Sequence, residues 1–178
     1  IRQDRKEFPA DYPLLYNLSI NDSEQFYCIC TGCAAATKKY KAHSGAMLEF
    51  VNDIAEEVEK YYPDITIQTS AYLFVLKAPT GIKPRKNVAV RYSFFGKTMK
   101  PLTHKANADR LKHLQDWSRL GKVQIWNYWV NFGKYYPNVG IVNLDTIDSN
   151  LKLFSKYNVN YVFSECEFPD TASFHPLR

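Results

Sequence analysis

Three cysteines lie close together in the first part of the chain and could bind a metal ion. Cys28, Cys30 and Cys33 form the pattern C-x-C-x-x-C, and the fourth cysteine, Cys166, is far away in the sequence. Clustered thiols can be zinc ligands when one more ligand comes from elsewhere; two can also form a disulfide, or all can stay as thiols. The spacing is not that of a standard zinc finger. We therefore predict no cofactor except, as one of three alternatives, zinc at this cysteine loop.

Two acidic residues, Asp22 and Glu165, stand where predicted strands end and could cooperate in acid–base chemistry. Glycoside hydrolysis generally needs two carboxyl groups that flank the scissile bond, one as proton donor and one as base or nucleophile. We predict Asp22 and Glu165 as this catalytic pair, with Glu24 and Glu167 as the next candidates. The alternatives are a turn-capping role for Asp22 and a salt bridge for Glu165.

Aromatic residues make up 15% of the chain, with 13 Tyr, 11 Phe and 3 Trp, and several of them follow the same strand ends. Tyr and Trp combine a flat apolar face with a polar tip, which suits sugar rings that are apolar on one face and hydroxylated at the edge. An arginine among them would suit an acidic sugar, because guanidinium pairs bidentately with carboxylate. Core packing of the rings and a structural ion pair of the arginine are the alternatives. The predicted substrate-binding residues are Tyr72, Arg91, Tyr92, Trp126, Asn127 and Tyr128.

An alternation of strand-like and helix-like segments must position these residues. Runs of β-branched and aromatic residues predict strands, and apolar residues at 3.6-residue spacing predict helices. Ser44 is expected to cap the first helix and Gly121 to follow the second as its C′ residue, while the cysteines are expected in a long loop. We expect strands at 14–21, 65–72, 88–94, 123–130 and 160–165, and helices at 44–62, 107–120 and 144–157.

This order of elements predicts an α/β fold with a parallel sheet. A doubly wound sheet and a (β/α)8 barrel both fit, but no glycine-rich phosphate loop follows a strand, which favours the barrel. A closed barrel has eight strands and typically about 250 residues, whereas this chain has five predicted strands in 178 residues. We therefore predict that residues 1–178 form a single partial TIM-barrel domain that is a piece of a longer polypeptide.

In such a barrel the functional side chains gather at the carboxyl ends of the strands. Because side chains alternate along a strand, Trp126 and Tyr128 are expected to point inward, and in the preceding strand the choice between Arg91 and Tyr92 stays open. The catalytic pair and the aromatic residues should then line one concave pocket.

Charge and hydrophobicity argue against other functional classes. The net charge is +5, and the longest basic cluster, Lys38, Lys39 and Lys41, is short for a nucleic-acid footprint. A membrane-spanning helix needs about 18 apolar residues in a row, and the sequence has no such stretch. We therefore expect neither a nucleic-acid partner nor a membrane span.

Several residue strings, taken in order, resemble a known bacterial family, domain of unknown function 4838. Its members look like relatives of (β/α)8-barrel glycoside hydrolases such as the hexosaminidase and α-glucuronidase families. The resemblance covers nearly the whole chain. The strings are S-I-N-D followed by C-x-C-x-x-C at 19–33, F-V-N-D-I-A at 50–55, Y-Y-P-D-I at 61–65, A-Y at 71–72, K-P-R-K-N-V at 83–88, I-W-N-Y at 125–128, F-S-E at 163–165 and F-H-P-L-R at 174–178.

The resemblance implies that the chain corresponds to about strands four to eight of the barrel, with Asp22 after strand four and Glu165 after strand eight. It also implies that the chain is a fragment of a longer multidomain protein. That protein would be secreted, periplasmic or an outer-surface lipoprotein of a glycan-degrading bacterium. Two departures stand out: Asn21-Asp22 replaces the Asp-Glu pair of the hexosaminidases, and Cys166 follows Glu165 where a small residue is expected.

Three hypotheses follow from these patterns. The first is a glycoside hydrolase acting on a complex or acidic glycan, with carbohydrate and the rest of the same polypeptide as partners. The second is a non-catalytic glycan-binding barrel, and the third is a scaffold whose cysteine loop binds zinc. The sequence leaves the sugar, the linkage and the oligomeric state open.

Overall fold

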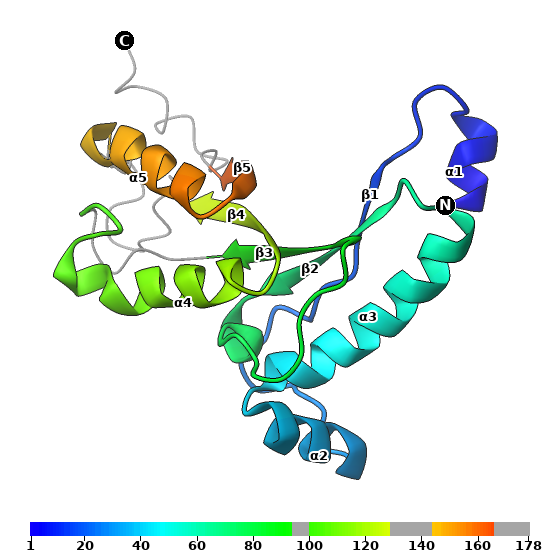
Figure 1. The fold of residues 1–178 in the computed structure, drawn as a ribbon, viewed down its shortest axis with the longest axis horizontal. Coiled ribbons are helices and arrows are strands. Elements are labelled where there is room, and N and C mark those ends of the chain that lie inside the picture. The colour runs from blue at the N-terminus through cyan, green and yellow to red at the C-terminus, as the bar shows by residue number, and fades with distance from the viewer. Residues whose placement is uncertain (94–99, 129–143, 166–178) are drawn as a thin grey trace. The chain divides into compact units, whose positions relative to one another are not determined.

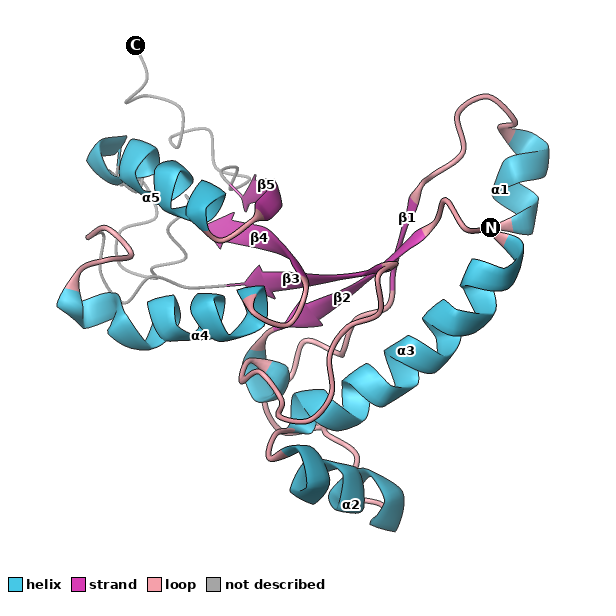
Figure 2. Cartoon of the chain, in the orientation of Figure 1, coloured by secondary structure: helices cyan, strands magenta, loops and turns pink. Residues whose placement is uncertain are grey.

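The computed structural model describes residues 1–93, 100–128 and 144–165. The chain divides into two compact units, residues 1–90 and 91–178, and helices alternate with strands along both of them (Figures 1 and 2). None of the helices within the described ranges combines the length and the apolar character needed to cross a membrane.

The five strands form one sheet whose order follows the sequence, β1-β2-β3-β4-β5. The pairs β1–β2 and β4–β5 are parallel, so the predicted α/β class with a parallel sheet is confirmed. Strands are present within the predicted ranges 65–72, 88–94, 123–130 and 160–165, of which residues 94, 129 and 130 lie outside the described residues. The first strand is much shorter than the predicted 14–21. The strand bounds are Leu15–Asn17 for β1, Thr66–Ala71 for β2, Val88–Ser93 for β3, Lys122–Tyr128 for β4 and Val159–Glu165 for β5.

The first unit is built around the long helix α3 (His43–Tyr61), which packs against β2. Leu48, Val51 and Ala55 are buried at helical spacing, as expected for one apolar face. The hydroxyl of Thr69 on β2 donates to the sulfur of Met47 on α3, at 3.4 Å. This face of β2 is therefore the helix-covered side of the sheet.

The predicted capping role of Ser44 is wrong. The N-cap of α3 is Ala42, which offers no side-chain cap. Ser44 lies inside the helix, fully buried, and its hydroxyl donates to the carbonyl of Lys77. Because the Ser44 hydroxyl makes this tertiary hydrogen bond, it does not cap the backbone N–H groups of the first turn.

A second helix, α2 (Thr31–Tyr40), lies where a loop was predicted, and it lies against the start of α3 (Figure 1). Its last residue, Tyr40, is buried, and the Tyr40 carbonyl accepts from the backbone N–H of Thr80 at 2.9 Å and from its hydroxyl at 3.2 Å. The Tyr40 hydroxyl donates to Glu49, and its ring covers Gly45, where an added Cβ would lie 2.2 Å from the Tyr40 Cβ. We call these contacts the Tyr40 clamp; it fixes α2 to α3.

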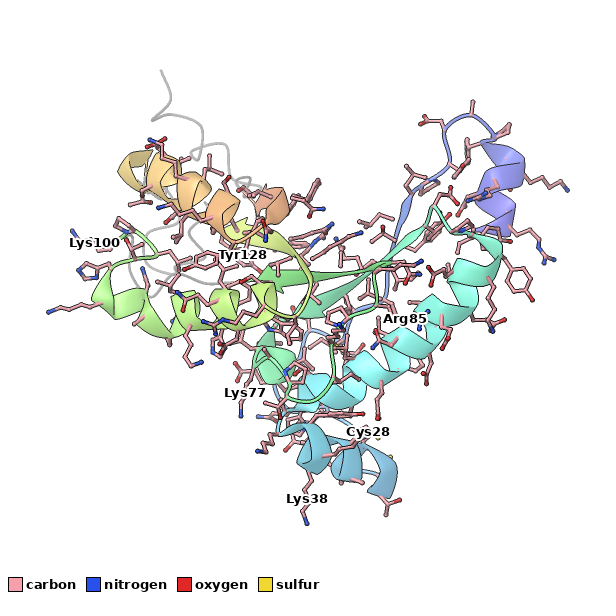
Figure 3. The ribbon with its side chains drawn as sticks, in the orientation of Figure 1. Cys28, Lys38, Lys77, Arg85, Lys100 and Tyr128 are labelled. Carbon is pink, nitrogen blue, oxygen red and sulfur yellow. The ribbon has the colours of Figure 1, made fainter. Side chains whose placement is uncertain are left out.

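The first unit also holds a short N-terminal helix, α1 (Arg2–Glu7), and a 3₁₀ turn, η1 (Leu73–Val75). Arg5 on α1 forms an ion pair with Asp64, just beyond the end of α3. Arg85, which is labelled in Figure 3, pairs with Glu56 and Glu59 on α3. Ion pairs thus connect α1 to the segment that follows α3, and the loop before β3 to the side of α3 that carries Glu56 and Glu59.

The second unit contains η2 (Lys105–Asn107), α4 (Ala108–Ser118) and α5 (Leu144–Lys156). Its core is formed by fully buried apolar side chains of α4 and β4: Leu114, Trp117, Val123 and Ile125. The C-cap of α4 is Arg119, so Gly121 lies one residue beyond the C′ position predicted for it. The N–H groups of both Leu120 and Gly121 bond to the carbonyl of Trp117, which closes the helix without a left-handed glycine.

Candidate functional sites

Trp126 is the centre of a polar and aromatic cluster on the second unit. Its indole Nε1 donates to Oε2 of Glu165 at 3.2 Å, and the Arg91 guanidinium lies over the Trp126 ring, 5.4 Å from its centre. Trp126 pairs with Phe163, and Tyr128 with Glu165, in the β4–β5 register. Since alternate residues of a strand share a face, these side chains lie on one face at the carboxyl ends of the strands. We call this set the Trp126 cluster.

Aromatic rings extend the Trp126 cluster along the same face. The Phe163 ring lies 4.5 Å from that of Trp126, and the Tyr128 ring 6.4 Å from it, both tilted. Tyr161 is 49% exposed and Phe163 36% exposed. Tyr128, at the end of β4, is labelled in Figure 3. Exposed rings beside a carboxylate and a guanidinium can stack on an apolar surface and hydrogen-bond to its polar edge.

Arg91 is a partly buried cation of this cluster that carries unused hydrogen-bonding capacity. Burial lowers the pKa of its guanidinium, and the nearby Tyr161 acts in the opposite direction. Its Nε is buried without a hydrogen-bond partner, and within residues 1–93, 100–128 and 144–165 no carboxylate forms an ion pair with it. A guanidinium in this state favours an anionic group of a ligand.

Two of the predicted binding residues lie in the helix-covered layer instead. Tyr92 is fully buried, its hydroxyl donates to the carbonyl of Arg110 on α4 at 3.1 Å, and burial raises the pKa of its phenol strongly. Asn127 is buried as well, and its Oδ1 accepts from the N–H of Tyr128 at 2.9 Å. Of the two residues left open on β3, Arg91 is therefore the one that joins the Trp126 cluster.

The other two predicted site residues belong to the first unit. Asp22 is exposed in the loop after β1, and its carboxylate makes no hydrogen bond or ion pair with any described residue; the turn here is made by Ser23, whose hydroxyl accepts from the N–H of Gln25. Tyr72 is partly exposed and directly precedes η1. Glu24 is exposed in the same loop, and Glu167 lies outside the described residues. That Asp22 acts together with Glu165 stays a prediction.

The three cysteines of the first unit lie close together in space. The Sγ atoms of Cys28, Cys30 and Cys33 all lie within 4.8 Å of one another, and all three thiols are free. Cys30 is the N-cap of α2 and accepts from the backbone N–H of Cys33 at 3.5 Å. That bond, with further bonds from the Cys28 and Cys33 thiols, lowers the pKa of Cys30 to about 7. Hydrogen bonds to Cys28 and Cys30 raise the pKa of Cys33 to about 11.

A pocket of about 390 Å³ lies beside these cysteines. Its wall includes Cys28 and Cys33 together with Asn21, Tyr27, His43 and Phe74. The rings of Tyr27 and His43 are 4.3 Å apart, and His43 Nδ1 lies 3.3 Å from the hydroxyl of Thr37. The pocket could not be predicted without α2, because this helix supplies part of the pocket wall. The sequence signal for it is the spacing of Cys33 and Thr37, which lie about one helical turn apart and both line the pocket.

A comparison with models of protein families places the chain in a family. No curated protein matches it, and no solved structure matches it. The model of the family described as Domain of unknown function (DUF4838) matches residues 5–175, and the chain therefore belongs to that family.

Proposed function

We propose that the chain forms about strands four to eight of a (β/α)8 barrel, and that this barrel is a glycoside hydrolase acting on a complex or acidic glycan. The parallel strands, in sequential order with helices between them, support the barrel. The proposal includes a secreted, periplasmic or outer-surface location, as expected for an enzyme that meets glycans outside the cell. Its partners are carbohydrate and the rest of the same polypeptide.

The observation that carries the proposal is the hydrogen bond from the Trp126 indole to the Glu165 carboxylate on an aromatic strand face. The indole N–H holds one oxygen of the Glu165 carboxylate at the strand face, where a base or nucleophile would be needed. The rings of the Trp126 cluster would stack on the apolar face of a sugar, and the Arg91 guanidinium would pair with its carboxylate. Asp22 would supply the second carboxyl group.

The test is glycan cleavage by the full-length protein on a panel of neutral and acidic glycans, with new reducing ends as the readout. Glu165→Gln keeps the shape and removes the charge, and it should lower turnover about 100- to 10,000-fold with little change in glycan binding. Asp22→Asn should do the same. Asp148→Asn is the control, because this exposed carboxylate on α5 pairs only with Lys152 among the described residues. Full activity in both Asp22→Asn and Glu165→Gln would dismiss the pair.

A second candidate function is glycan binding without hydrolysis. It is favoured by the Asn21-Asp22 string, which lacks the Asp-Glu pair of the hexosaminidases, and by the exposed rings of Tyr161 and Phe163. In this case the protein binds glycans on the panel but releases no reducing ends. Trp126→Ala should then weaken binding, while Glu165→Gln affects binding rather than turnover.

A further inference from the structure

We propose that Cys28, Cys30 and Cys33 bind one zinc ion as three thiolates and leave its fourth coordination position open to a small ligand from the adjacent pocket. The inference is independent of the proposed glycan chemistry, because none of the residues that carry it is a proposed catalytic or sugar-binding residue. It rests on the convergence of the three sulfurs, their contacts with α2, and the composition of the pocket.

The distances between the sulfurs suit a single metal ion. With zinc–sulfur bonds of about 2.3 Å, tetrahedral geometry places two sulfurs about 3.8 Å apart. The Sγ atoms already lie within 4.8 Å of one another, so a shift of about 1 Å at most completes the geometry. Cys28 and Cys30 are exposed and Cys33 is partly exposed, so their side chains can make this adjustment without moving the core.

The use of all three cysteines distinguishes metal binding from a disulfide. A disulfide joins two sulfurs at about 2.05 Å and leaves the third without a role, whereas the three sulfurs here approach one another together. Thiolate sulfur is also a ligand type that zinc accepts readily. As each sulfur binds the metal, its thiol releases one proton to solvent, and the resulting site carries one net negative charge.

The start of α2 can accommodate that charge. Cys30 is the N-cap of this 10-residue helix, and the backbone N–H of Cys33 points at its sulfur at 3.5 Å. Free N–H groups in the first turn of a helix stabilise a negative charge. The first turn of α2 contains no acidic residue that would oppose this effect.

The open position follows from the surroundings of the cysteines. Among the His, Cys, Asp and Glu residues that the structure describes, no fourth one joins the three-sulfur group. His43 borders the same pocket, but its ring packs on Tyr27 and Phe74 and its Nδ1 faces Thr37. Three protein ligands with a free position is the pattern of zinc sites that bind water or substrate. The wall of rings around about 390 Å³ suits a small, partly apolar ligand with a nitrogen or sulfur donor.

The first test measures zinc in the full-length protein after reduction, chelator treatment and reloading. Elemental analysis should give one zinc per chain, and X-ray absorption should show three sulfurs at about 2.3 Å and one lighter atom. Cys28→Ser, Cys30→Ser and Cys33→Ser should each lower zinc affinity at least about 100-fold, the upper end of the loss for an outer-shell partner. Circular dichroism checks that each variant is folded, and Cys166→Ser is the matched control, expected to bind zinc like the parent protein.

The second test addresses the open position by replacing zinc with cobalt, whose visible spectrum reports its ligands. Added imidazole should shift the cobalt spectrum in the parent protein, in Cys166→Ser and in His43→Gln alike. Three freely titratable thiols without bound metal, or a disulfide detected by mass spectrometry, would overturn the site. Loss of zinc in Cys166→Ser or in His43→Gln, or a spectrum that imidazole does not change, would overturn the open position.

Discussion

The two units of the chain place their reactive side chains on different parts of the α/β layer. In the first unit the cysteines and the pocket beside them belong to a loop and to α2, outside the strands. In the second unit Arg91, Trp126 and Glu165 project from β3, β4 and β5 themselves. One site therefore depends on how a peripheral helix is attached, and the other on the register of the sheet.

The two sites should therefore respond differently to substitutions that change the fold around them. The cysteine site can be lost by small changes around α2 while the core of the first unit survives. The Trp126 cluster shares its strands with the core of the second unit. The same substitution should therefore change the stability of the fold more on the buried side of these strands than on the side of the Trp126 cluster.

The largest effect is expected for Trp117→Ala compared with Trp126→Ala in the second unit. Trp117 is fully buried in α4, and its loss should lower the free energy of unfolding by about 3–5 kcal/mol. Trp126 is partly exposed on the strand face, so its loss should cost less than half as much. Urea unfolding followed by circular dichroism measures both, and equal losses would place Trp126 in the core rather than in a binding surface.

In the first unit, Gly45→Ala should disturb the attachment of α2, whereas Gly32→Ala should not. A Cβ at Gly45 would lie 2.2 Å from the Tyr40 Cβ, while a Cβ at Gly32 meets nothing within 4 Å. Overpacking of this kind costs about 1–3 kcal/mol, and alanine in a helix is up to about 1 kcal/mol better than glycine. The midpoint temperature of unfolding should therefore fall for Gly45→Ala and rise for Gly32→Ala. A shift of both midpoints in the same direction would show that the Tyr40 clamp is loose.

Each unit also has an asparagine whose side chain holds a loop by hydrogen bonds. Replacing each of them with aspartate should lower the free energy of unfolding by different amounts. Buried Asn107 donates through Nδ2 to the carbonyls of Lys100 at 3.0 Å and Pro101 at 3.2 Å. A carboxylate there faces two acceptors and should cost about 1–3 kcal/mol. Asn52 loses one donor bond, to Lys83, but its Oδ1 can still accept from the N–H of Arg85. Urea unfolding should show the smaller loss for Asn52→Asp, and the reverse order would contradict this description.

The smallest effect concerns the acid stability of the first unit. Lys86 and, to a lesser extent, Arg85 lower the pKa of Glu59 below its usual 4.5. A carboxyl group whose pKa is lower in the folded state stabilises the fold above its unfolded pKa, and this contribution is lost as the pH falls through the folded pKa. Glu59→Gln should therefore reduce stability at neutral pH and weaken its decline below about pH 4.5.

The control for Glu59 is Asp53→Asn on the same helix. Asp53 is exposed and has no ion pair with any residue that the structure describes, so the same change in net charge should leave the acid decline unaltered. Thermal unfolding between neutral pH and about pH 3 compares the two variants. An identical response would mean that the ion pairs of Glu59 are fully screened by water.

The strands and α3 could be predicted because their patterns are strong and local. α3 has apolar residues at helical spacing over 19 residues, and β2 to β5 are rich in β-branched and aromatic residues. α2 could not be predicted in the same way. Its sequence, TGCAAATKKY, buries only Ala36 and Tyr40, so it lacks an apolar stripe, and tertiary contacts at Tyr40 hold it in place.

The candidate sites were predictable to different degrees for a similar reason. The convergence of Cys28, Cys30 and Cys33 follows from their short spacing. The grouping of Trp126 with Glu165 depends on the β4–β5 register, which contains an irregularity: Val123 pairs with Val159, but Gln124 pairs with Tyr161. Asn160 is thus skipped, which sets the face on which Tyr161 and Phe163 lie, and no sequence pattern marks such a bulge.

The Tyr40 clamp has a consequence for limited proteolysis. Trypsin cleaves after lysine or arginine, and residues 18–37 contain neither, so the exposed loop before α2 gives it no target. Lys38, Lys39 and Lys41 are exposed, but cutting there requires an extended backbone. The hydrogen bonds that the Tyr40 carbonyl accepts from Thr80, and the one that its hydroxyl donates to Glu49, oppose that change. Chymotrypsin, in contrast, finds Phe26 with 78% of its surface exposed in the same loop. Between residues 18 and 41 the native protein should accordingly be nicked first by the protease that prefers aromatic residues, with α2 and α3 remaining on one fragment.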